Sequence, residues 1–344
     1  MRTLRCAVIG LGRIGWRFHV PQILQHKGFE LTAVVDPLPE RLAEARTEFG
    51  VCGYADHGAL LRSTELDLVV VASPTRFHVE QVMAAFEHGV DVFCDKPLAP
   101  TLPEVDRLIA AMEQHGRKLM VYQPHRARAE VVALRSILSQ NLIGPLYMLR
   151  RAVLHYARRN DWQAFTRHGG GMLNNYGAHY IDQLLYLCAS RARRISCALR
   201  TIASLGDADD VVKALIETEN EVILDIEINM AAAHPAPPWQ ILGRYGSIVL
   251  DQAQRAWLVR FFDPNDLPKL AVQEGLAAND RRYGSGEVIP WQEVSVPVER
   301  SAAIDFYSRC YDYFALGGEP FVPISQTREV MRVLDECRRC ASSP

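Results

Sequence analysis

The first 123 residues alternate between short apolar runs and segments of helical periodicity, and this alternation restricts the fold more than any other feature of the chain. The runs are rich in Val, Leu and Ile, as expected for strands that are buried on both faces of a sheet. They cover residues 6–10, 30–36, 67–73, 91–95 and 118–123. Helical patterns separate them at 39–49, 75–88 and 101–115. This repetition predicts right-handed crossovers and a parallel, doubly wound sheet in an α/β fold.

Beyond residue 123 the pattern changes. A helical segment and a longer apolar run at 146–156 precede another helix, and residues 194–298 then read mostly as strands. In the segment 222–229, apolar residues alternate with Asp, Glu and Asn, which indicates a half-buried antiparallel strand. A chain of 344 residues is too long for one comfortable core. We therefore predict two domains, which comprise residues 1–123 and residues 124–344.

Charge and composition narrow the class of protein. The net charge is −2, so the chain carries no overall field that would attract nucleic acid or an anionic membrane. The apolar run near the start is too short for a signal peptide, and no stretch approaches the roughly 18 apolar residues of a spanning helix. Eight scattered cysteines suit the reduced thiols of a cytoplasmic protein. The histidines lack metal-binding spacings such as HExxH, and we expect no metal site.

Residues 10–15 form a glycine-rich turn between the first predicted strand and a helical segment. The turn fits the pattern GxGxxG, and Asp36 closes the next strand. This arrangement predicts a dinucleotide site, where backbone N–H groups approach a pyrophosphate and the helix N-terminus favours its charge. Asp36 would accept hydrogen bonds from ribose hydroxyls and repel a 2′-phosphate, so we expect NAD, with NADP less favoured. The other cofactor contacts predicted in this loop are Gly10, Gly12, Arg13 and Ile14.

Two further polar clusters, SPT and DKP, follow the runs VVVA and VFC of the same predicted sheet. Ligands of open α/β sheets bind at the carboxyl ends of the strands, so these clusters are expected to converge on one crevice. A lysine after a buried strand is costly without a partner or a task. Lys96 is therefore expected to donate a hydrogen bond to a substrate oxygen, the alternative being a surface lysine before a turn proline. The cofactor contacts predicted here are Ser73, Pro74, Thr75, His78, Asp95 and Lys96.

The segment 169–187, GGGMLNNYGAHYIDQLLYL, begins with three glycines and continues as an apolar helical pattern. Asn175, His179 and Asp182 stand at i, i+4 and i+7, so a regular helix would carry them on one face. Such a face is either a satisfied polar seam inside a core or the lining of a pocket.

The motifs GLGRIG, VVDPLPER, VVVASPTRFHVEQV, GVDVFCDKPLA and GGGMLNNYGAHYIDQLLYL follow one another in that order along nearly the whole chain. Together they resemble the glucose-fructose oxidoreductase / inositol dehydrogenase / rhizopine-catabolism (Gfo/Idh/MocA) family. The resemblance implies an N-terminal Rossmann domain and a C-terminal α+β domain with a large, open, mostly antiparallel sheet. It also implies hydride transfer between tightly held NAD(P) and a hydroxyl or carbonyl group of a sugar, inositol or related polyol.

By position, Lys96 matches the family's active-site lysine, His179 its acid/base histidine and Asp182 its downstream acid. Asn175 stands where most characterised members have an aspartate. In the segment 122–128, YQPHRAR, Pro and His replace a polar and a basic residue. The resemblance favours the pocket for the helix of 169–187, with the glycines allowing the chain to approach the cofactor.

We expect an NAD(P)-dependent dehydrogenase in which His179 takes the hydroxyl proton, Lys96 stabilises the oxyanion and Asn175 hydrogen-bonds the hydroxyl or the imidazole. An amide cannot stabilise an imidazolium as a carboxylate would, so the pKa of His179 is expected to lie nearer its ordinary value of about 6.5 than in a relative with an aspartate at position 175. On the loop before the helix, a guanidinium and an indole suit a polyhydroxylated ligand. The substrate contacts predicted are Arg159, Trp162, Asn175, His179 and Asp182.

Two other functions fit the same residues. One is a different enzyme on this fold, a reductase of a non-sugar carbonyl or dihydrodiol, or an NAD-dependent glycosidase. The other is a silent NAD(P)-binding sensor or regulatory protein, which the missing carboxylate at Asn175 supports. A sheet face without helices is a common oligomer surface, so we also expect a homodimer or homotetramer through the C-terminal sheet.

Overall fold

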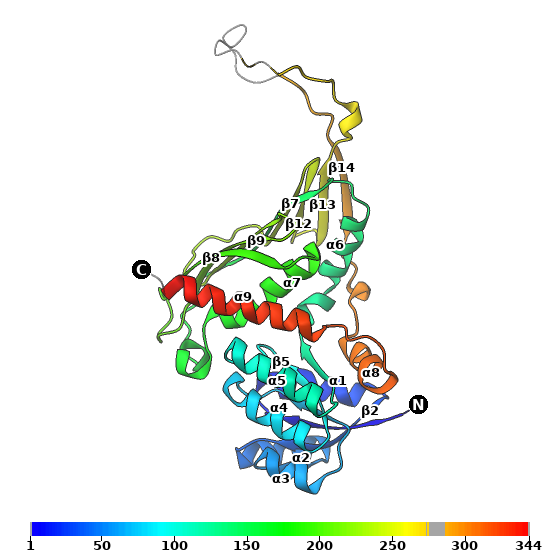
Figure 1. Ribbon diagram of the computed structural model, residues 1–344, viewed down its shortest axis with the longest axis vertical. Helices are drawn as coiled ribbons and strands as arrows, with labels where there is room; N and C mark the ends of the chain where they lie inside the picture. The colour runs from blue at the N-terminus through cyan, green and yellow to red at the C-terminus, as the bar shows by residue number, and fades with distance from the viewer. Residues whose placement is uncertain (1, 273, 275–285, 343–344) are drawn as a thin grey trace.

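The computed structural model describes residues 2–272, 274 and 286–342, and it contains two β-sheets, one in each half of the molecule (Figure 1). The first sheet has six parallel strands in the order β3-β2-β1-β4-β5-β6. They are β1 (Leu4–Ile9), β2 (Phe29–Val35), β3 (Cys52–Tyr54), β4 (Leu68–Val71), β5 (Asp91–Asp95) and β6 (Leu119–Tyr122). The strand order reverses at β1, and the carboxyl ends of β1 and β4 flank the point where ligands of such sheets bind. The predicted Rossmann topology is confirmed.

Helices connect these strands, as the periodicity of the sequence predicts. Strands β1 and β4 are lined almost entirely by buried residues because helices cover both faces of the sheet. At the start of α5, Thr101 and Glu104 form a capping box that fixes where the helix begins. The connecting helices are η1 (Gly15–His19), α1 (Val20–Gln25), α2 (Pro39–Phe49), α3 (His57–Ser63), α4 (His78–Glu87) and α5 (Leu102–Gln114).

The second sheet has eight strands in the order β14-β13-β12-β11-β7-β10-β9-β8, and only the central pair β7–β10 is parallel among the described pairings. Helices α6 (Ala129–Ser139), α7 (Ala178–Cys188) and α9 (Ile324–Ser342) lie on one face (Figure 1). Leu224, Ile226 and Ile228 point into that covered face, which confirms the predicted alternation. The strands are β7 (Leu146–Leu154), β8 (Ala192–Arg200), β9 (Val211–Thr218), β10 (Ile223–Asn229), β11 (Trp239–Gly243), β12 (Gly246–Asp251), β13 (Ala256–Phe261) and β14 (Gln292–Pro297).

The open face of the second sheet is not uniformly apolar. At its centre, Arg150 and Lys213 each form ion pairs with both Asp225 and Glu227. Leu215 lies on the same side of β9 as Lys213, two residues along the strand, and is 46% exposed. The face expected to be an apolar oligomer surface is therefore a charged cluster bordered by exposed apolar residues.

The end of the chain connects the two halves. Helix α8 (Phe306–Leu316) returns to the first sheet, where Phe306 and Tyr307 pack against Phe93, and the Tyr307 hydroxyl lies 2.7 Å from Nδ1 of the buried His19. Helix α9 then packs on α5 of the first half and on α7 and β8 of the second (Figure 1). These two helices hold the first and second sheets in a fixed relation across the crevice.

Within the described residues, no helix is long and apolar enough to cross a bilayer, and no cluster of three or more acidic, cysteine or histidine side chains is placed to hold a metal ion. All eight cysteines are free, and six of them are buried.

Candidate active site

The glycine-rich loop after β1 is closely packed on its inner side and open at one position. Gly10 has a φ of +98°, and a Cβ there would lie 2.7 Å from the backbone nitrogen of Ser73 on the turn after β4. A Cβ on Gly15 would overlap the carbonyl oxygen of Gly10, whereas a Cβ on Gly12 would have no described protein atom within 4 Å. Open space at this point, beside the free N–H groups of a helix start, fits a bound pyrophosphate. Of the two other predicted contacts, Arg13 is exposed and Ile14 is half-buried.

Asp36 lies beside this loop, as predicted, but its carboxylate is already engaged by protein groups. It accepts hydrogen bonds from the backbone N–H groups of Leu11 (2.9 Å) and Leu38 (3.1 Å). The guanidinium of Arg41, on α2, lies 3.2 Å from the same carboxylate. Asp36 therefore ties the glycine loop to the turn after β2, and Arg41 partly neutralises the charge expected to repel a 2′-phosphate.

The turn after β4 holds the next group of predicted contacts. Ser73 is half-buried, Pro74 is exposed and Thr75 is buried. The Ser73 hydroxyl donates to Oε1 of Gln81 (2.6 Å). His78 is placed differently from the prediction: its Nε2 lies 2.8 Å from the carbonyl of Ser73 and its Nδ1 lies 3.0 Å from the carbonyl of Pro97. His78 is buried, and its ring lies between the two carbonyls, to one of which a neutral imidazole donates, so it links the two turns.

Lys96 reaches across from the first sheet to the second half of the molecule. Its Nζ donates to the backbone carbonyl of Asn175 at 2.7 Å and lies 3.4 Å from that residue's Oδ1. Burial lowers the pKa of Lys96 to about 8, against the charge of Asp95, which raises it. Burial likewise raises the pKa of Asp95 to about 6, and its carboxylate accepts from the Lys96 N–H (2.8 Å). The predicted convergence of the DKP turn and the glycine-led helix is therefore present.

The glycine-led helix starts as a π-helix, η6 (Leu173–Gly177), and continues as α7. Its first turn is held by Asp209, whose carboxylate accepts from Leu173 N and whose carbonyl accepts from Met172 N, both at 2.8 Å. A π-helix has more residues per turn than an α-helix, so side chains on either side of the junction do not keep the i, i+4, i+7 register. Asn175 belongs to the π segment, and the three polar residues expected on one face have three different partners.

Asp182 does not face the crevice. Both of its oxygens bind the guanidinium of Arg126, at 2.6 Å from Nε and 2.5 Å from Nη2, and the two side chains are 0% and 2% exposed. Arg126 belongs to the short helix η3 (Pro124–Ala127) after β6, and its Nη1 also donates to Oε1 of Gln326 (2.6 Å). The predicted substrate contact is thus replaced by a buried, bidentate ion pair that fixes α7 to η3.

His179 is buried, and its ring contacts two residues of the segment 122–128. Its Nδ1 lies 3.2 Å from Oε1 of Gln123, and its ring stacks on that of His125 with centroids 3.7 Å apart. Arg128 donates to Nε2 of His125 (2.7 Å). Burial, together with the charges of Lys96, His125 and Arg128, lowers the pKa of His179 well below its ordinary value. The argument from the sequence considered only the missing carboxylate, whereas desolvation is the largest influence on this pKa.

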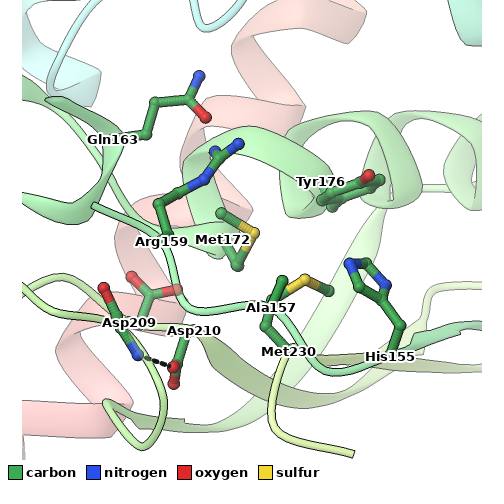
Figure 2. A pocket seen from close by; sticks show the side chains of 10 residues that line it. His155, Ala157, Arg159, Gln163, Met172, Tyr176, Asp209, Asp210 and Met230 are labelled. Atoms are coloured by element: carbon green, nitrogen blue, oxygen red, sulfur yellow. Dashed lines mark hydrogen bonds between the residues drawn. The ribbon is translucent and has the colours of Figure 1, made fainter. Parts of the chain in front are cut away.

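The loop before the helix lines a cavity of about 70 Å³ (Figure 2). Arg159 is part of the lining, as predicted, whereas Trp162 lies outside it and is 46% exposed. The glycines pack on the protein itself: a Cβ on Gly170 would meet the carbonyl of Gln163, and one on Gly171 would meet Asp209. They allow the loop to fold back on the helix start. The cavity is lined by His155, Ala157, Arg159, Gln163, Met172, Tyr176, Ser204, Asp209, Asp210 and Met230.

Sequence reasoning missed Gln123, Arg126 and Gln163. The first two lie directly after β6, so the strand-end rule that singled out Lys96 could have found Gln123. Gln163 accepts a hydrogen bond from Nδ2 of Asn175 (3.2 Å) and joins the cavity to Lys96 through that residue. No local pattern marks it, because the contact depends on how the loop folds back.

Comparison with known proteins places this architecture in a family. Residues 4–123 match the oxidoreductase family with an NAD-binding Rossmann fold, and residues 131–249 match the GFO/IDH/MocA C-terminal domain. The chain therefore belongs to the Gfo/Idh/MocA family of oxidoreductases, and its first half is an NAD-binding Rossmann domain.

Individual relatives agree with this assignment. D-glucoside 3-dehydrogenase of Escherichia coli K12 is 30% identical over 54% of this chain, and the match spans only 54% of that relative's own length. Inositol 2-dehydrogenase of Pseudarthrobacter chlorophenolicus is 30% identical over 67% of this chain and 68% of its own length. An NAD-binding protein from Listeria innocua has the same fold, with a TM-score of 0.83, 23% identity and coverage of 99% of this chain and 95% of its own.

Proposed function

We propose that the protein transfers a hydride between a nicotinamide cofactor and a hydroxyl or carbonyl carbon of a sugar, an inositol or a related polyol. The observation that carries the proposal is the hydrogen bond of 2.7 Å from Lys96 Nζ to the carbonyl of Asn175, beside His179. It brings an ammonium group from the cofactor-binding sheet to the helix that borders the cavity. Relatives at 30% identity that act as D-glucoside and inositol dehydrogenases support the substrate class.

The cofactor would lie along the loop and turns at the ends of β1, β2 and β4. When bound, NAD supplies the hydride-accepting and hydride-donating chemistry. Asp36 favours NAD as the main cofactor, and Arg41 on the same carboxylate would accommodate NADP as a second one. The groups proposed to hold the cofactor are Gly10, Gly12, Arg13, Ile14, Asp36, Ser73, Pro74, Thr75, Asp95 and Lys96.

Lys96 is proposed to move the proton, and His179 to bind the substrate oxygen. Acid–base catalysis is most efficient when the pKa of the group is close to the working pH, and burial lowers the pKa of Lys96 to about 8. With Gln123 Oε1 accepting from Nδ1, His179 keeps a lone pair on Nε2, and the substrate oxygen that it binds is that of a neighbouring hydroxyl, from which it accepts a hydrogen bond. The proton of the reacting hydroxyl is thus left to Lys96. Asn175 holds the ammonium of Lys96 in position through its carbonyl.

The test is the substitution Lys96→Met, with Lys118→Met as a matched control. Lys118 is also half-buried and also donates to a backbone carbonyl, that of Tyr313 at 2.7 Å, but at the α8 contact away from the crevice. We expect Lys96→Met to lower kcat by about 10²–10⁴-fold on a polyol that the wild type oxidises, as measured by NADH absorbance. Lys118→Met should stay within threefold. Undiminished turnover in Lys96→Met would refute the assignment.

A second candidate is an NAD(P)-binding protein without turnover. Asn175 favours it, because an amide stands where a carboxylate would hold a charged histidine, and burial lowers the pKa of His179 well below its ordinary value. This function predicts tight NADH binding and no NADH formation across sugars, inositols and dihydrodiols. Any substrate-dependent NADH formation abolished by Lys96→Met excludes it.

The assembly is proposed to be a homodimer or homotetramer formed through the open face of the second sheet. Leu215 and the charged cluster around Lys213 lie on that face and are available for a self-complementary contact.

We also propose that the chain divides into a cofactor domain of residues 1–123 and a substrate domain of residues 124–344. The basis is the change of sequence pattern after residue 123, and α8 is the part of the second domain that returns to the first sheet.

A further inference from the structure

The cavity beside Asn175 contains a cation that is poorly neutralised by the protein. Nη1 of Arg159 is buried and has no hydrogen-bond partner among the described residues. Its only ion pair in the part of the chain that the structure describes joins Nε to Oδ2 of Asp161 at 3.7 Å, and that aspartate is 51% exposed. A guanidinium N–H that is desolvated and unpaired is unfavourable, so this position gains most from a ligand that accepts hydrogen bonds.

The two acids of the cavity are directed to other partners. The carboxylate of Asp210 accepts from the backbone N–H groups of Ile202, Ala203 and Ser204 at 2.6–2.8 Å. Asp209 accepts from Leu173 N. In Figure 2 the guanidinium of Arg159 is directed toward Gln163 and away from both acids. The acids thus shape the loop and leave the positive end of Arg159 facing the cavity.

The cavity is also connected to the proposed reaction centre. Gln163 lines the cavity and accepts from Asn175, whose carbonyl accepts from Lys96. The cavity has a volume of about 70 Å³, which is room for one small charged substituent and not for a whole sugar ring. The cavity thus lies two hydrogen bonds from Lys96, and the distal part of a substrate that reacts at Lys96 is proposed to extend toward Arg159.

We infer that the cavity binds an anionic substituent of the substrate, a carboxylate or phosphate ester on a polyhydroxylated chain or ring, through the guanidinium of Arg159. The inference rests on the proposed function and names the substrate class within it. A planar guanidinium with free N–H groups matches the oxygens of a carboxylate or phosphate better than it matches a single hydroxyl. A neutral sugar would satisfy Nη1 with one weaker hydrogen bond, and an amino sugar would be repelled.

The experiment compares matched substrates rather than single compounds. Glucose, galactose and mannose are each paired with their uronate and their 6-phosphate, and NADH formation at saturating NAD gives kcat/KM for each member. The variants are Arg159→Gln, Arg159→Lys and, as control, Arg158→Gln. Arg158 is adjacent and exposed and does not line the cavity.

We expect the wild type to prefer the anionic member of a pair. Arg159→Gln should lower kcat/KM for the anionic member about 10- to 100-fold more than for the neutral one, because a charge-assisted contact is lost. Arg159→Lys should restore part of the preference by keeping the charge, and Arg158→Gln should stay within twofold. The relative rates of uronate and 6-phosphate distinguish the two anion sources. An equal loss for neutral and anionic members, or a wild-type preference for neutral sugars, overturns the inference.

Direct binding separates this inference from the proposed function. If the wild type oxidises no member of the panel, the proposed function loses support, and calorimetric titration of the NAD-loaded protein with the same compounds decides the inference. Tighter binding of uronates or phosphates that Arg159→Gln removes supports the anion site. Binding of no anionic member, or equal binding to wild type and Arg159→Gln, overturns it.

Discussion

Charged groups lie on both sides of the second sheet, and the two sides differ in how far these charges are exposed to solvent. On the helix side, Arg126 and Asp182 form a bidentate pair that is almost completely buried. On the open side, Lys213 pairs with Asp225 and Glu227 while its own side chain is 43% exposed. A buried pair cannot lose one partner without leaving a desolvated charge, whereas an exposed pair can exchange its partner for water. The helix side is therefore built to fix geometry, and the open side is free to meet another surface.

The largest expected difference between the two sides is in stability. Arg126→Met should lower the free energy of unfolding by about 3–5 kcal/mol, because Asp182 would be left buried and unpaired. Lys213→Met should change it by less than about 1 kcal/mol, because Arg150 still pairs with both Asp225 and Glu227. Denaturant unfolding followed by circular dichroism measures both. Equal losses in the two variants would remove the distinction drawn between the two sides.

The second largest effect is expected on the pH dependence of catalysis, through Lys96, which contacts Asn175 on the helix side of the second sheet. Burial lowers the pKa of Lys96 from 10.5 to about 8, so below pH 8 the ammonium cannot accept the proton of an alcohol. We expect kcat/KM for oxidation to rise about 50-fold from pH 6 to pH 8 and then level off, and the reverse reduction to fall above pH 8. His179, with a pKa well below 6.5, should add no step in this range. A pH profile of kcat/KM with a single break near pH 6.5 would contradict this role of Lys96 and favour His179 as the proton acceptor.

A smaller effect is expected from a substitution at Gln123, which directly precedes η3 and positions His179. Gln123→Ala removes the acceptor at 3.2 Å from Nδ1 and should lower kcat about fivefold, since one neutral hydrogen bond contributes about 1 kcal/mol. NADH affinity should be unchanged, because the cofactor loop is not touched. Steady-state kinetics together with an NADH fluorescence titration measure both quantities, and a loss confined to NADH binding would contradict the positioning role.

The smallest change in unfolding free energy is expected on the open side, although its effect on assembly is large. Leu215→Glu should alter stability by less than about 0.5 kcal/mol, because the side chain is already exposed. It should shift the protein from an oligomer to a monomer in sedimentation at micromolar concentration, because a buried carboxylate would be introduced at the contact. Thr47→Glu, on the exposed surface of α2, serves as the control. Unchanged mass in Leu215→Glu would place the oligomer contact elsewhere.

Local patterns predicted the first sheet and the residues at its strand ends well. The spacing of Gly10, Gly12 and Gly15 depends on a turn and a helix that are adjacent in sequence, and Lys96 directly follows β5. These features need only neighbouring residues and the rule that parallel strands end on one edge. The contact of Lys96 with the carbonyl of Asn175, at 2.7 Å, was not predicted, because Lys96 was expected to donate to a substrate oxygen.

Other parts of the site depend on distant packing and escaped prediction. Asp182 pairs with Arg126, which is 56 positions away, and neither residue indicates the other in the sequence. The π-helical start of the helix rotates Asn175 out of the register that an α-helix would give. The pKa of His179 depends on burial against His125, which a single missing carboxylate could not indicate.

Helix α8 belongs to the first sheet in space although it follows the second sheet in sequence, with Phe306 stacked on Phe93 and Tyr307 in edge contact with the same ring. A cofactor domain transplanted from a relative with one junction near residue 123 would therefore arrive without part of its own core. Recombination between family members would need a second junction near residue 300, so that the aromatic helix travels with the strands that it covers. The order of residues along the chain is thus a poor guide to which pieces can be exchanged.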